Sequence, residues 1–185
     1  MQEVFERLKG VQFFETKDFR NFELSEAWSF DNAVERLLKA GEIPRPLLEC
    51  IRLISTEDHR KQALLQVNQV FLFARSKFSS DIKLRKWLES GRFGDGITTN
   101  ISSMAQLMAL ANRCLKLAKS IGTSSEKIAQ QTQKLVDAPS DIKKIRSLER
   151  AEETCEGKKV DLERALKGFI SAVDDLASFV GSRKL

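Results

Sequence analysis

The stretch "EDHRKQALLQVNQVFLFARSKF", residues 57–78, decides the fold class of this chain. Its apolar side chains recur every three or four positions, the spacing that places them on one face of an α-helix. Further apolar residues widen this face, so the predicted helix must pack against other helices to bury it. The recurring residues are Leu64, Val67, Phe71, Ala74 and Phe78, and the widening residues are Leu65, Val70 and Phe73.

The same helical spacing extends toward the N-terminus, and the alternating pattern of a strand is hard to find. We expect a short helix at residues 3–8 and a longer one that Ser25 caps and Gly41 ends. Pro46 suits the first turn of the next helix, which continues through Ile54. These local signals all mark the ends of helices.

Two further helices are expected in the second half of the chain. An apolar stripe that begins near Ser102 predicts a helix that ends at Gly122. The residues "TSSE", 123–126, have the spacing of a capping box, so they are expected to open a second helix that runs to about Val136.

The last predicted helix is the longest. A break at "APSD", residues 138–141, precedes it, and Ser140 is its expected cap. Apolar spacing then continues to Val180, with a kink expected near Gly157.

These segments predict an all-α fold, an irregular bundle of about five to seven helices with a long C-terminal helix. The composition agrees, because only three prolines and nine glycines occur among 185 residues, of which 31% are charged. Residues 1–185 are expected to form a single helical domain, with an aromatic-rich N-terminal part at 1–55 and the main bundle at 56–185.

The chain offers few residues for catalysis, and we expect a non-enzymatic protein with no cofactor and no metal site. Its one histidine, His59, lies in a charged first turn, and no glycine-rich phosphate loop or zinc-protease motif is present. Cys50, Cys114 and Cys155 are widely spaced, so they are expected to be buried free thiols. The longest uncharged run, 97–112, is too polar and too short to cross a bilayer, so no transmembrane segment is expected.

A basic amphipathic segment, "KLRKWLESGRF" at residues 83–93, is the main candidate for a functional site. At about 100° per residue, its leucines and tryptophan share one strip of a helix, and cations border the strip. Interfacial helices have this pattern, because the apolar side chains enter the lipid while the cations meet anionic headgroups. The alternative is that Trp87 is buried in the bundle and the lysines extend to solvent. The candidate lipid or partner contacts are Lys83, Leu84, Arg85, Lys86, Trp87, Leu88, Arg92 and Phe93.

The order of features within residues 57–181 resembles the peroxin-eleven family of peroxisomal membrane-elongation proteins. The similar segments are "EDHRKQALLQVNQVFLFARSKF", "KLRKWLESGRFGDGI", "LMALANRCLKLAKSIG" and "RALKGFISAVDDLASFVG". Arg85, Lys86, Arg92 and Phe93 match the basic and aromatic positions of the family. The resemblance implies a role in peroxisome elongation or proliferation, through insertion of the basic helix into one leaflet. The strongly apolar C-terminal segment that anchors members of the family does not occur in residues 57–181, so the resemblance does not extend to membrane anchoring.

Two functions from different classes remain open. The first is a helical protein, cytoplasmic or peripheral on an organelle membrane, that acts at an anionic lipid surface. The second is a soluble helical-bundle adaptor or scaffold that binds partner helices. Nucleic-acid binding ranks third, because a net charge of +5 suits phosphate but no nucleic-acid-binding motif occurs. The apolar seams of the long helices also permit a homodimer.

Overall fold

The structure, a computed structural model, describes residues 29–41, 43–77 and 104–183, and these ranges contain five α-helices and no strand. The all-α class and the long C-terminal helix are therefore confirmed. The helices are α2 (Phe30–Ala40), α3 (Arg45–Arg52), α4 (Glu57–Lys77), α6 (Met104–Val136) and α7 (Ile142–Arg183).

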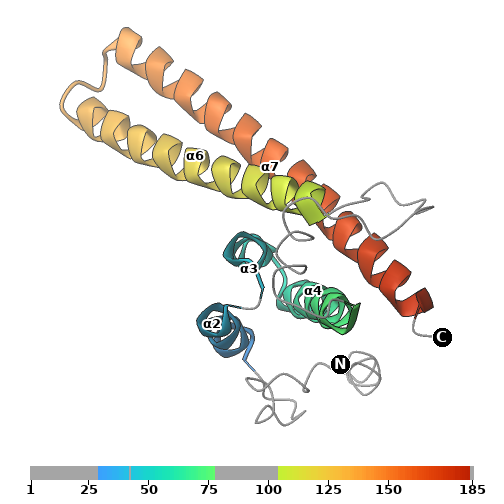
Figure 1. The fold of residues 1–185 in the computed structure, drawn as a ribbon. Helices are drawn as coiled ribbons and strands as arrows, with labels where there is room; N and C mark the ends of the chain where they lie inside the picture. Colours follow the sequence, from blue (N-terminus) through green and yellow to red (C-terminus); the bar gives the residue numbers. More distant parts are fainter. Residues whose placement is uncertain (1–28, 42, 78–103, 184–185) are drawn as a thin grey trace.

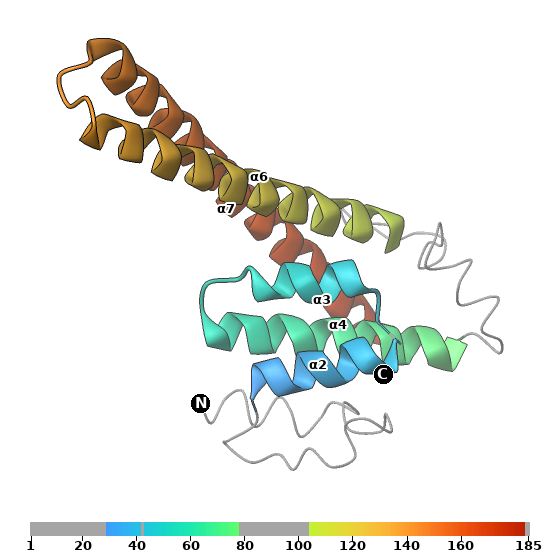
Figure 2. The same ribbon diagram turned by 90° about the vertical axis from the view of Figure 1, so that its left-hand side faces the viewer.

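The two longest helices, α6 and α7, lie side by side as an antiparallel hairpin (Figure 1). They contain 33 and 42 residues, which corresponds to lengths of roughly 50 and 63 Å at about 1.5 Å per residue. The shorter helices α2, α3 and α4 pack near one end of this hairpin, and the turn between α6 and α7 lies at the other end (Figure 2).

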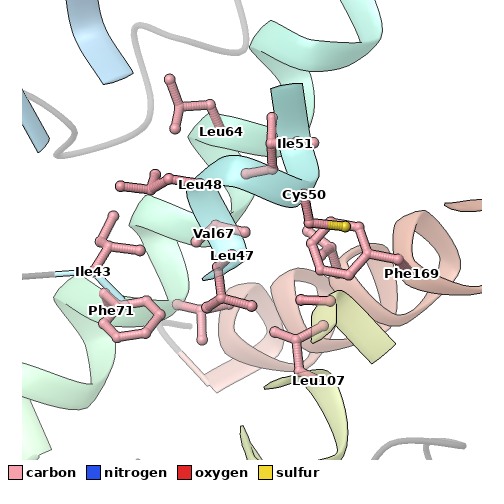
Figure 3. Packing of buried hydrophobic residues seen from close by; sticks show 14 of the residues in the cluster. Ile43, Leu47, Leu48, Cys50, Ile51, Leu64, Val67, Phe71, Leu107 and Phe169 are labelled. Atoms are coloured by element: carbon pink, nitrogen blue, oxygen red, sulfur yellow. The ribbon is translucent and has the colours of Figure 1, made fainter. Parts of the chain in front are cut away.

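One hydrophobic core joins all five helices at the end of the hairpin where α2, α3 and α4 lie. Helix α4 is buried on more than one side, as the wide apolar face of its sequence predicts, and it contacts α2, α3 and α7. Figure 3 shows α3 and α4 side chains meeting Leu107 of α6 and Phe169 of α7. The largest fully buried residues are Phe169, Leu37, Leu47, Leu48, Ile51, Leu64, Met104, Leu107 and Leu176.

Helix α2 ends where the sequence predicts and begins later than predicted. Gly41 adopts φ of 66°, and its N–H donates to the carbonyl of Leu37, which is the expected glycine stop. The cap is Ser29 and not Ser25, because the Ser29 hydroxyl accepts a hydrogen bond from the N–H of Asn32 at 3.4 Å. Ser25 itself lies outside the described residues.

Helix α6 continues through Gly122, so the predicted stop there and the predicted new start at Thr123 are wrong. The Thr123 hydroxyl donates to the carbonyl of Lys119, one turn back, at 3.2 Å. A serine or threonine in the interior of a helix makes this bond, whereas a capping residue accepts from an N–H ahead of it. Packing against α7 supplies the stabilisation that a glycine inside a helix lacks.

Helix α7 begins one residue later than the predicted cap implies. The carboxylate of Asp141 accepts from the N–H groups of Lys143 and Lys144 at 3.0 and 3.2 Å, so Asp141 and not Ser140 is the cap. A carboxylate at this position also interacts favourably with the helix dipole. The helix then continues through Gly157 as one element.

Polar contacts between helices fix the packing of this core. The Gln66 side chain of α4 donates to the carboxylate of Asp174 in α7 at 2.6 Å. Arg60 donates to the carbonyl of Ile54 at 2.8 Å, and its guanidinium lies 5.5 Å from the centre of the Phe30 ring. Asp174 thus interrupts an apolar stripe without being left unpaired.

Candidate functional site

The hairpin extends past the core as an arm, which we define as residues 121–136 of α6 and 142–160 of α7. Both views show this part of the hairpin pointing away from α2, α3 and α4 (Figures 1 and 2). Cys155 is the one fully buried side chain along the arm, whereas Leu107, Ala111 and Cys114 of α6 are all buried in the core. Within the described part of the chain, therefore, the two helices of the arm support mainly each other.

A narrow seam holds the two helices of the arm together. Its side chains recur at alternating intervals of three and four residues, which is the heptad spacing of a coiled coil. Positions outside the seam are mostly exposed, so the arm has one apolar line and a largely polar outer surface. The seam residues are Ile121, Ser124, Ile128, Gln131 and Leu135 in α6, and Leu148, Ala151, Cys155 and Lys158 in α7.

Polar side chains interrupt this seam and set its register. Lys158 of α7 donates to the Ser124 hydroxyl of α6 at 2.7 Å, and the Gln131 amide donates to Ser147 at 3.4 Å. The Gln131 carbonyl oxygen is buried and has no hydrogen-bond partner in the described part of the protein. Polar residues at seam positions specify alignment at the expense of stability. The arm is thus aligned specifically but held weakly.

The tip of the arm exposes apolar side chains. Val136 ends α6 and Ile142 begins α7, so both flank the turn, and their exposed fractions are 68% and 64%. Val160, which lies farther along the arm, is 49% exposed. These three are the large hydrophobic side chains that are exposed among the described residues. Two of them thus share one end of the molecule, away from the core.

Charge is distributed unevenly along the arm. Residues 127–150, around the tip, include six basic and three acidic side chains, whereas residues 151–163 include two basic and five acidic ones. The cations Lys134, Lys143 and Arg146 are exposed, and no ion pair is recorded for them within the described ranges. The tip is therefore a basic surface with an apolar centre.

The site predicted from the sequence lies outside the described residues. Lys83, Leu84, Arg85, Lys86, Trp87, Leu88, Arg92 and Phe93 all fall there, so the lipid-facing and core-facing alternatives for Trp87 both stay predictions. No helix in the described ranges is long and apolar enough to span a bilayer.

Other predicted residues lie in ordinary structural positions. His59 is exposed in the first turn of α4, where its Nδ1 is 2.6 Å from the Thr56 hydroxyl. The three cysteines are buried and free, as predicted. Residues 29–41, 43–77 and 104–183 hold no group of three side chains that could bind a metal ion.

The break at residues 138–141 predicts only a helix boundary, so the tip is not among the residues predicted from the sequence. The signal that was available is the matching heptad spacing on both sides of that break, which indicates a hairpin that folds back on itself. Comparison with family models, with curated proteins and with solved structures finds no match.

Proposed function

We propose that the protein is a non-enzymatic helical adaptor that binds a partner protein through the tip of the arm. The single observation that supports this proposal is the pair of exposed apolar residues, Val136 and Ile142, at the end of an arm that projects from the core. Exposed apolar groups gathered at one place and surrounded by charge are typical of interaction sites, whereas scattered ones are ordinary surface.

The partner surface that complements the tip is an amphipathic helix with acidic borders. Apolar residues of such a helix cover Val136 and Ile142, and its carboxylates meet Lys134, Lys143 and Arg146. Association through a small patch of this kind is reversible, because only a few side chains leave water.

A membrane is a poorer occupant of the tip than a protein. Asp137 and Asp141 lie in the turn between Val136 and Ile142, so insertion into lipid would place their carboxylates at the deepest point. Charged groups are costly in the hydrocarbon, and anionic headgroups repel carboxylates. A protein partner can leave both aspartates in water.

Site-specific photo-crosslinking tests the adaptor proposal. A photoreactive amino acid replaces Ile142 in one version of the full chain and Val160 in a control version, because both side chains are exposed on the same arm. In cells that naturally contain the protein, we expect position 142 to give a discrete adduct that position 160 does not give. The same adducts from both positions, or none from position 142, would contradict the proposal.

A second candidate function is action at an anionic membrane surface. It is supported by the basic amphipathic sequence at residues 83–93, with Trp87 among its cations, and by the resemblance to the peroxin-eleven family. The proposed mechanism is insertion of this segment into one leaflet, which favours membrane curvature.

Sedimentation with liposomes tests this second candidate. We expect the full chain to sediment with vesicles that contain phosphatidylserine at low salt, to dissociate at high salt, and to lose binding after Trp87→Glu while its melting temperature stays unchanged. If Trp87→Glu instead lowers the melting temperature sharply, the residue is buried in the bundle and the membrane proposal fails.

A further inference from the structure

Two buried cysteines lie on the faces of α3 and α6 that pack together in the core. Cys50 follows Leu47 on one face of α3, and Cys114 follows Leu107 and Ala111 on one face of α6. These faces meet in the core, and all five side chains are buried there. Figure 3 shows Cys50 beside the Phe169 ring, where α3 approaches α6 and α7.

Each of the two thiols has the largest single influence on the pKa of the other. The pKa of Cys50 is raised, mainly by the interaction with Cys114 and also by burial. Cys50 therefore stays protonated and is the proton donor toward Cys114. The same interaction lowers the pKa of Cys114 against the effect of burial, and the neighbouring cation Arg113 lowers it further. Because Arg113 belongs to the same helix as Cys114 and stays beside it when α3 moves away, Cys114 is the thiol that ionises more readily.

We propose that Cys50 and Cys114 are a redox-sensitive site, at which hydrogen peroxide converts the two thiols into a disulfide that links α3 to α6. The Cys114 thiolate attacks one peroxide oxygen, which breaks the O–O bond and gives a sulfenic acid and, after proton uptake, water. The Cys50 sulfur then attacks the sulfenic sulfur, and the oxygen leaves as a second water. Overall, two thiols lose two protons and two electrons, and one peroxide molecule is reduced to two waters.

The bond would hold the short helices against the hairpin. Helix α3 packs on α6 in the apolar core, and neither thiol is accessible to solvent. Reaction therefore requires a brief separation of α3 from α6, so we expect formation of the bond to be slow and the bond, once formed, to oppose that separation. A dithiol reductant should cleave the disulfide during the same brief separation of α3 from α6.

Peptide mapping of the folded wild-type protein tests this proposal. The result of this test does not depend on whether any variant folds. The full chain is treated with hydrogen peroxide in native buffer, its free thiols are alkylated, and the digest is analysed by mass spectrometry. We expect one intramolecular link, between the peptides of Cys50 and Cys114, that dithiothreitol removes.

Cys155 provides the matched control within the chain. It is also buried, yet its sulfur lies 4.0 Å from Ser125, about three turns of α6 beyond Cys114. Cys155→Ser should leave the yield of the link unchanged, whereas Cys114→Ser should abolish it. The proposal is overturned if peroxide leaves both thiols free, oxidises either one only to sulfinic or sulfonic acid, links Cys155 instead, or forms the link only in urea.

Discussion

At the scale of single residues, the protein stabilises its core with a few polar contacts between helices that are far apart in sequence. Asp174 would be an unfavourable member of an apolar stripe if it lacked a partner, because a buried polar group without a hydrogen bond is costly. Gln66 supplies that partner across the interface of α4 and α7 at 2.6 Å. Asp175, the next residue, is also half-buried, and no hydrogen bond is recorded for its side chain within the described ranges.

The contrast between these aspartates gives a prediction. Asp174→Ala should lower the free energy of unfolding by roughly 1.5–3 kcal/mol, the usual value for a hydrogen bond to a charged group. Asp175→Ala is the control, and it should change this free energy by less. Urea denaturation followed by circular dichroism measures both variants, and equal losses would show that the contact with Gln66 does not stabilise the core.

Phe169 gives a second prediction at this scale, because it is fully buried where α3, α6 and α7 meet. Phe169→Ala should cost about 3–5 kcal/mol of unfolding free energy through lost burial and the cavity that remains. Val160→Ala on the exposed arm should change the free energy of unfolding by no more than about 0.5 kcal/mol. Thermal and urea denaturation of both variants check this difference, and a small effect of Phe169→Ala would place the core elsewhere.

At the scale of elements, helix ends that depend on local chemistry could be predicted, whereas those that depend on neighbouring helices could not. Gly41 and Pro46 act through their own backbone preferences, and both stand where the sequence predicts. Gly122 and Thr123 carry the same kind of signal, yet α6 runs through them because α7 packs alongside. Ser140 and Asp141 are adjacent and equally suited to cap a helix, so the sequence does not distinguish them.

The continuity of α6 can be tested at Gly122. An added Cβ would meet no atom within 4 Å, so Gly122→Ala should raise the free energy of unfolding by about 0.5–1 kcal/mol. Gly41 is the control, because its φ of +66° disfavours other residues and Gly41→Ala should destabilise the protein. Chemical denaturation measures the free energy of unfolding of both variants. A lower value for Gly122→Ala than for the wild-type protein would indicate a helix end at that position.

The seam of the arm gives a further prediction at this scale. Gln131 leaves a buried carbonyl oxygen unpaired, so Gln131→Leu removes that cost and adds apolar contact between α6 and α7. We expect slower amide hydrogen exchange in residues 121–136 and 142–160, and unchanged exchange in α2. Gln130→Leu, at a neighbouring exposed position, is the control and should not slow exchange. Equal slowing in both variants would show that Gln131 is not a seam residue.

At the scale of the whole molecule, the hairpin contributes to two regions with different properties. One end of α6 and α7 completes a core with α2, α3 and α4, and the other end projects as an arm with a basic and apolar tip. The sequence predicts the residues of the core well, because burial follows the periodicity of each helix, although it divides α6 at Gly122. It does not predict the exposure of Val136 and Ile142, because exposure depends on which other helices lie beside the turn.

This separation predicts that the tip can be altered without disturbing the fold. Val136→Ser combined with Ile142→Ser should leave the melting temperature of the core nearly unchanged, because both side chains are already in water. Differential scanning calorimetry measures this temperature. A large decrease would mean that the two residues support the fold and are not free to bind a partner.

The most direct test of the proposed function is the affinity of the partner identified by crosslinking from position 142. Isothermal titration calorimetry compares the wild-type chain, the Val136→Ser and Ile142→Ser double variant, and Val160→Ser, with the same purified partner. We predict that the double variant weakens Kd by roughly a hundredfold, since each of the two buried apolar side chains contributes about 1.5 kcal/mol, while Val160→Ser leaves Kd unchanged. Equal affinity for the wild-type chain and the double variant would contradict the adaptor proposal.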